Sequence, residues 1–193
     1  MIVSRFSWTV IVRRFDGSGD YDRDWDAYKQ GFGDADGEYW LGNAFLHHMT
    51  NNRTYQLRFD LEDWDGNTRY AEYSSFVINS EADNYRLLLG DYSGNANLDA
   101  SDDADSGFLY HHNQQFSTRA RDNDASATSC VTRSGHGGGL WYKGCSRVAI
   151  TGTYCQTSTC GDDYNNLFWK AWKGYTYSMK TITMMFRPHL PGL

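Results

Sequence analysis

The chain has 193 residues and a net charge of −6, with 18 Lys and Arg against 24 Asp and Glu. Binding to nucleic acids or to anionic membranes needs an excess of basic residues, so this balance argues against both partners. Hydrophobic residues make up 40% of the chain, which argues against disorder. No apolar run approaches the length of about 20 residues that a membrane-spanning helix needs. We therefore expect a folded domain that neither binds nucleic acid nor inserts into a membrane.

The first segment is predicted to form a strand and a short helix. The apolar, β-branched run Trp8–Arg14 is typical of a strand. Large aromatic residues then recur at i, i+3 and i+7, which predicts an amphipathic helix over Asp24–Phe32. Either Asp22 or Asp24 is suited to cap its start, and Gly33 is suited to end it.

Further elements follow along the chain. A second short helix is predicted over Leu41–Met49. Every second residue of Tyr55–Leu61 is apolar, as in a half-buried strand, and Tyr70–Ile78 is expected to pair back onto it as a hairpin. Tyr85–Leu89 is another apolar strand, and Tyr177–Phe186 returns to alternation as the last strand, which closes the sheet.

Between these strands lies a polar, irregular insert that contains all the cysteines. They are Cys130, Cys145, Cys155 and Cys160. No pair has the CxxC spacing of a zinc ribbon, and an even number in a loop-rich region indicates two disulfides and an oxidising compartment. The residues alone leave all three pairings open. The glycosylation sequon Asn52-Arg53-Thr54 is consistent with secretion.

The acidic bend at Asp122 and Asp124 is the sharpest candidate for a metal site. Carboxylates at i and i+2 of a loop can point at one ion. Calcium takes about six to eight oxygen ligands, so backbone carbonyls, such as those of Ser126 and Thr128, and waters would have to complete the shell. The spacing does not match an EF-hand, and a solvated acidic turn is the alternative interpretation.

Motifs for catalysis are not evident in the sequence. There is no GxSxG elbow, no phosphate-binding loop and no GxGxxG. The adjacent pairs His47-His48 and His111-His112 diverge in direction on a helix or strand, so we expect packing or surface roles for them. Spacing alone leaves a glycosidase with paired carboxylates open, but nothing supports one. We expect no enzyme.

Aromatic residues crowd the insert and form a candidate ligand wall. They are Trp141, Tyr142, Tyr154, Tyr164, Phe168, Trp169, Trp172 and Tyr175. Most are expected in the core, and a few exposed ones would line a pocket. Exposed aromatic walls suit sugars and protein partners alike, so this feature does not separate the two.

Several motifs together resemble the fibrinogen C-terminal domain. The opening residues Trp8-Thr9-Val10, Arg13-Arg14 and Asp16-Gly17-Ser18 look like the start of that domain. The resemblance continues, in order and spacing, through Tyr28-Lys29-Gln30-Gly31-Phe32-Gly33, Gly37-Glu38-Tyr39-Trp40-Leu41-Gly42-Asn43, His112-Asn113-Gln114-Gln115-Phe116-Ser117-Thr118, Asp122-Asn123-Asp124, Tyr177-Ser178-Met179-Lys180 and Arg187-Pro188. Within the fibrinogen C-terminal domain family, we expect this chain to resemble the ficolin and tachylectin lectins most.

This resemblance implies an α+β fold, with a central twisted antiparallel sheet, short helices and a loop-rich, calcium-binding C-terminal subdomain. Residues 1–193 would form one domain that lacks the short first segment of the family. Its body would comprise about 7–110 plus the last strand, 177–187, and its binding subdomain about 111–176. The family is extracellular, and none of its members is known as an enzyme.

The resemblance also implies particular site residues. Calcium would be held by the side chains of Asp122 and Asp124 and the carbonyls of Ser126 and Thr128. The disulfide beside that site would be Cys130–Cys145, which leaves Cys155–Cys160 as a local pair.

In the lectin branch of the family, a cis peptide before the second cysteine turns backbone N–H groups towards an acetyl group. The matching residues are Gly144, Cys145 and Ser146, with Tyr164 and Tyr175 as walls, and a rim near His136 is reshaped by two extra residues. We therefore expect a secreted pattern-recognition lectin of innate immunity that binds microbial or acetylated glycans and gains avidity as an oligomer. The alternative is a receptor-binding module of the angiopoietin or tenascin type.

Overall fold

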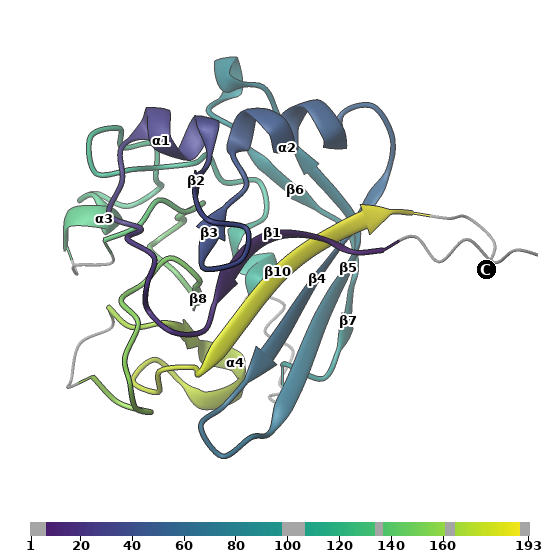
Figure 1. Cartoon of the computed structure of the whole chain (residues 1–193). Helices are drawn as coiled ribbons and strands as arrows, with labels where there is room; N and C mark the ends of the chain where they lie inside the picture. Colours follow the sequence, from purple (N-terminus) through teal and green to yellow (C-terminus); the bar gives the residue numbers. More distant parts are fainter. Residues whose placement is uncertain (1–6, 98–106, 134–136, 161–164, 190–193) are drawn as a thin grey trace, which may run out of the picture.

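The computed structural model of the chain describes residues 7–97, 107–133, 137–160 and 165–189. Its centre is an antiparallel sheet with strand order β2-β3-β1-β10-β4-β5-β6, and β7 also pairs with β5 (Figure 1). The strands are β1 (Thr9–Arg14), β2 (Phe32–Gly33), β3 (Tyr39–Trp40), β4 (Tyr55–Glu62), β5 (Thr68–Ile78), β6 (Leu87–Leu89), β7 (Tyr92–Gly94) and β10 (Thr181–Pro188).

The strands form close to where alternation predicts them, but β10 begins at Thr181 and not at the expected Tyr177, because residues 177–180 are not extended. The even positions of β4 are half-buried and the odd positions, from Tyr55 to Leu61, are buried. On β10, Ile182, Met184 and Phe186 are buried in the same way, and Met184 lies opposite Phe59. β10 does not add an edge strand. It lies between β1 and β4, so the end of the chain completes the middle of the sheet.

The strand expected at Tyr85–Leu89 is shorter than predicted. Only β6 (Leu87–Leu89) is extended, because Asn84 and Tyr85 have φ values of 50° and 51° and turn the chain before it. The polar stretch that follows contains β7 and the 3₁₀ helix η2 (Phe108–His111).

Two helices lie side by side near one end of the sheet: α1 (Trp25–Gln30) and α2 (Asn43–Thr50) (Figure 1). Asp24, not Asp22, caps α1 by accepting a hydrogen bond from the backbone N–H of Ala27 at 2.9 Å. The expected end at Gly33 is wrong. The helix stops at Gly31, whose φ of 94° and contact with the backbone of β3 exclude a side chain and direct Phe32 into β2.

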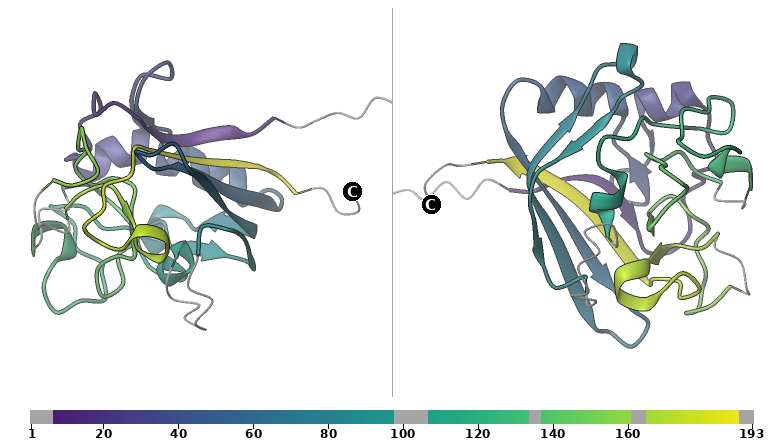
Figure 2. Two further views of the ribbon diagram at one scale, coloured as in Figure 1. Left: turned by 90° about the horizontal axis from the view of Figure 1, so that it is seen from below. Right: turned by 180° about the vertical axis from the view of Figure 1, so that it is seen from behind.

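The insert forms a lobe against one side of the sheet, seen in both views of Figure 2. It contains the short helices α3 (Cys130–Arg133) and α4 (Lys170–Lys173) and the pair β8 (Val148–Ala149) and β9 (Phe168–Trp169). Half of its eight large aromatics are core, since Trp141, Tyr142, Phe168 and Trp169 are buried. Tyr154, Trp172 and Tyr175 are half-buried, and Tyr164 lies outside the described residues. In the part of the chain that the structure describes, no helix has the length and apolar character needed to span a bilayer.

Candidate functional site

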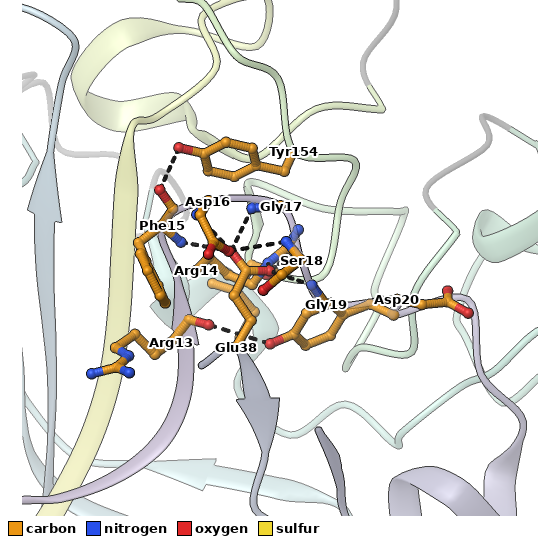
Figure 3. A network of polar contacts seen from close by, with 12 residues as sticks. Arg13, Arg14, Phe15, Asp16, Gly17, Ser18, Gly19, Asp20, Glu38 and Tyr154 are labelled. Atoms are coloured by element: carbon orange, nitrogen blue, oxygen red, sulfur yellow. Dashed lines mark hydrogen bonds and ion pairs between the residues drawn. The ribbon is translucent and has the colours of Figure 1, made fainter. Parts of the chain in front are cut away.

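A buried ion pair anchors the lobe to the sheet (Figure 3). Arg14, at the end of β1, donates from Nε to Glu38 at 3.0 Å and from Nη1 to the carbonyls of Ile150 and Gly152 at 2.9 and 2.8 Å. The lobe backbone is therefore tied directly to a central strand. This anchor fixes the position of the residues that follow Cys145.

The acidic bend is organised by its own carboxylates. Asp124 accepts from the backbone N–H of Ser126 at 2.8 Å and, through its other oxygen, from that of Cys130 at 2.7 Å. Asp122 accepts from the backbone N–H of Asp124 at 3.2 Å. The two side chains thus gather the backbone of one turn, and Asp124 is only half-exposed while Asp122 is exposed.

Neighbouring segments hold this bend in place. The N–H of Ala125 donates to the carbonyl of Lys143 at 3.1 Å, and the side chain of Asn123 donates to the carbonyl of Phe116 at 2.7 Å. The disulfide Cys130–Cys145 joins the end of the bend to the same segment as Lys143. The second disulfide joins Cys155 and Cys160.

The chemistry of the bend fits calcium. Burial raises the pKa of Asp124, and the nearby charge of Asp122 raises it further, so a cation would relieve both effects. In the described part of the chain, the carbonyl oxygens of Ser126 and Thr128 accept no hydrogen bond and remain available as ligands. No cluster of three or more His, Cys, Asp or Glu occurs in that part, so a metal here would depend on carbonyls and water as well as on the two carboxylates.

Only some of the residues expected to form an acetyl pocket lie in the described part of the chain. Gly144 is exposed, Cys145 has a φ of 73°, and Ser146 is buried with a hydroxyl that has no partner among the described residues. The described residues contain no cis peptide bond, so the cis peptide of the lectin branch is not found before Cys145. His136 and Tyr164 lie outside the described residues.

A buried histidine holds the segment that follows Cys145. The Nδ1 of His111 donates to the carbonyl of Trp141 at 2.7 Å, and its Nε2 accepts from the N–H groups of Arg147 and Val148, each at 3.3 Å. Burial lowers the pKa of His111 to about 4, so the ring is neutral at physiological pH. His111 therefore has the packing role expected for it.

Arg147 lies between two aromatic rings, an arrangement that the sequence analysis missed. Its guanidinium carbon is 4.8 Å from the centre of the Tyr110 ring, and its Nη1 donates to the hydroxyl of Tyr175. The amine of Lys143 is 4.9 Å from the same Tyr110 ring, and that of Lys170 is 5.6 Å from the Tyr175 ring. We call these five residues the cation–aromatic row. The only signal in the sequence is that Lys143 and Arg147 flank Cys145 symmetrically.

Comparisons with known sequences point to one family. The family described as "Fibrinogen beta and gamma chains, C-terminal globular domain" matches residues 1–189. Human angiopoietin-related protein 7 is 41% identical over 97% of this chain and 51% of its own length. Mouse angiopoietin-1 is 39% identical over 97% of this chain and 36% of its own length. The chain therefore spans about half, or less, of these curated relatives.

Comparisons with solved structures point to the same family. The fibrinogen-like globe domain of human ANGPTL2 is 38% identical, covers 95% of this chain and 81% of that one, and superposes with a TM-score of 0.86. That of human ANGPTL6 is 34% identical, with 98% and 81% coverage and a TM-score of 0.87. A lamprey fibrin D-dimer, solved with the peptide ligand Gly-His-Arg-Pro-amide, is 34% identical over 99% of this chain and 65% of that one, with a TM-score of 0.84.

These relatives overturn part of the functional expectation. The prediction of a lectin for microbial or acetylated glycans, acting in pattern recognition and innate immunity, is wrong, because the relatives are angiopoietins and angiopoietin-related proteins. The alternative, a protein-binding module, is the one that these relatives favour.

The family itself was correctly predicted, together with its α+β fold around an antiparallel sheet. The motif residues lie on β1, α1, β2, β3 and the start of α2, in the loop segments 112–118 and 122–124, and just before and at the end of β10. The fold is that of the fibrinogen-like globe domains. With residues 1–189 matched and relatives near 40% identity across almost the whole chain, the chain belongs to the fibrinogen C-terminal domain family.

Proposed function

We propose that this chain is the extracellular, protein-binding module of an angiopoietin-type protein and that it binds its partner, a receptor, without catalysing a reaction. The observation that carries the proposal is the 41% identity with angiopoietin-related protein 7 over 97% of the chain. A related fibrin D-dimer binds a short peptide, which supports a protein segment as the ligand. The two disulfides suit an oxidising, extracellular environment.

The proposed contact surface is the cation–aromatic row of the lobe. Arginine and tyrosine are enriched among the residues that dominate the binding energy of protein interfaces. Here Arg147 is held between Tyr110 and Tyr175, so little side-chain entropy remains to be lost on binding. On a chain with a net charge of −6, this local positive row favours an acidic segment of the partner.

Calcium at the acidic bend would act on this surface indirectly. The bend is bonded to the carbonyl of Lys143 through Ala125 and is joined to Cys145 through Cys130. A cation bound by Asp122 and Asp124 would neutralise the bend and stiffen that connection. It would shape the lobe and leave the partner contact to other side chains.

Binding to a panel of cell-surface receptor ectodomains, measured by biolayer interferometry with calcium present, tests the proposal. We expect at least one ectodomain to bind and the variant Lys170→Glu to weaken it at least tenfold, because the new charge repels an acidic partner. Arg53→Glu is the matched control, since it reverses one exposed charge in the turn between α2 and β4.

Two outcomes would overturn the proposal. One is a panel in which no ectodomain binds the folded wild-type chain. The other is binding that survives Lys170→Glu but is lost in Arg53→Glu, which would move the contact from the lobe to the opposite end of the sheet.

A further inference from the structure

The turn between α2 and β4 carries a modification signal that the proposed function does not use. Asn52-Arg53-Thr54 is the single Asn-x-Ser/Thr sequence of the chain, and all three residues are exposed. The turn follows the last residue of α2 and precedes Tyr55, which is buried at the start of β4. A sequon in an exposed turn is open to enzymes and to added bulk, whereas the buried residue beside it is not.

The hydrogen bonding of Asn52 leaves room for one substituent. Its side-chain nitrogen Nδ2 donates to the carbonyl of His48 at 2.5 Å. An amide nitrogen carries two hydrogens, so the second one is not needed for this bond. Replacing the second hydrogen would leave the bond to His48, and with it the end of α2, intact. The backbone beyond is also tied down, because the N–H of His189 donates to the carbonyl of Thr54 at 2.9 Å.

The turn also lies away from the lobe. In Figure 1, the connection from α2 to β4 is on the side of the sheet where β10 ends, whereas α3 and β8 lie on the other side, and the rear view in Figure 2 agrees. A bulky group on this turn would extend into solvent there. It would not cover the cation–aromatic row or the acidic bend.

We propose that Asn52 carries an N-linked oligosaccharide, an inference that rests on the extracellular route in the proposed function. The donor would be a lipid-linked oligosaccharide diphosphate. A bond forms between Nδ2 and the anomeric carbon of the sugar, the bond from that carbon to the phosphate oxygen breaks, and Nδ2 loses one proton while the lipid diphosphate leaves. The hydroxyl of Thr54 supplies the recognition that the sequon requires.

The test expresses the chain behind a supplied signal peptide in mammalian cells and measures the intact mass of both secreted and cell-retained protein. Peptide N-glycosidase treatment should remove the sugar mass and convert Asn52 to aspartate, which peptide mapping detects. Asn52→Gln and Thr54→Ala should each abolish the added mass. Thr54→Ser is the matched control, since it keeps the hydroxyl and should keep most of the glycan.

An unmodified Asn52 in the wild-type protein would overturn this inference. Sugar mass that persists in Asn52→Gln would do so too. Because the signal peptide is supplied, the result does not depend on receptor binding, and failure here leaves the ectodomain experiment unaffected. Conversely, Asn52→Gln should bind any ectodomain as the wild type does, because the turn lies away from the lobe.

Discussion

Arg14 and Glu38 form an ion pair in which the guanidinium Nε lies 3.0 Å from the carboxylate and both residues are at most 3% exposed. The carboxylate of Glu38 also accepts the backbone N–H groups of Phe15, Asp16, Gly17 and Gly19 (Figure 3). Burial alone raises the pKa of Glu38, but the charge of Arg14 and these N–H groups hold it below its usual range.

Glu38→Gln should therefore destabilise the whole domain. It removes the charge that compensates buried Arg14 and brings a side-chain donor towards backbone donors. Breaking one side of a buried ion pair costs about 3–5 kcal/mol, which urea unfolding would measure. Asp20→Asn is the control, because its partner Arg23 is 3.4 Å away and both side chains are about half-exposed, and such pairs contribute at most about 1 kcal/mol. An equal loss of unfolding free energy in Glu38→Gln and Asp20→Asn would contradict this account.

Asp124→Ala should abolish calcium binding, and Asp122→Ala should weaken or abolish it, when titrated by calorimetry. The matched control is Asp36→Ala, since Asp34 and Asp36 have the same spacing and the N–H of Asp36 donates to Asp34 at 2.9 Å. Unchanged calcium affinity in both variants of the bend, or a loss in the control, would contradict the site.

Calcium affinity should also fall as the pH is lowered. The pKa of Asp124 is raised in the metal-free protein, first by burial and then by the charge of Asp122. Protons therefore compete with the ion at a higher pH than at an ordinary aspartate. Calorimetry at two pH values checks this, and affinity that increases on acidification would contradict it.

The domain should lose stability on mild acidification because of His111. Its pKa is lowered from 6.5 to about 4 by burial, so the unfolded chain binds more protons between these values. The contribution of the neutral ring to the free energy of unfolding is complete above pH 6.5. It declines as the pH falls towards 4, and about 2 kcal/mol is lost at pH 5. Protonation would also place a hydrogen on Nε2 against the N–H groups of Arg147 and Val148.

Chemical unfolding at pH 7 and pH 5 measures this dependence. His111→Gln should reduce the pH dependence of stability. The control His112→Gln changes the exposed neighbour and should retain that dependence. The same pH dependence in both variants would exclude His111 as its source.

The two disulfides should contribute unequally. Cys130–Cys145 closes a separation of 15 residues and Cys155–Cys160 one of 5. Chain-entropy arguments give about 3 kcal/mol for the longer loop and about 2 kcal/mol for the shorter. Replacing both members of each pair with alanine and measuring urea unfolding compares them. Only the first replacement should also weaken calcium binding, because Asp124 bonds to the N–H of Cys130.

The local sequence pattern predicted the helices, the strands and the acidic bend. The alternation in β4, the cap at Asp24 and the spacing of Asp122 and Asp124 depend on neighbours within a few residues, so each was readable before the fold was known. The order and spacing of the motifs were enough to identify the family over the whole chain. They did not identify the branch, because an insert rich in aromatic residues suits sugars and protein partners alike.

Contacts between distant segments decided the rest. Helix α1 ends at Gly31 because the backbone of β3 approaches it, and β10 lies beside β1 although they are at opposite ends of the chain. Tyr110 and Arg147 come from separate segments and meet only when the lobe folds. Periodicity and spacing report the conformation of a segment, whereas such pairings depend on the packing of the complete core, which no single segment encodes.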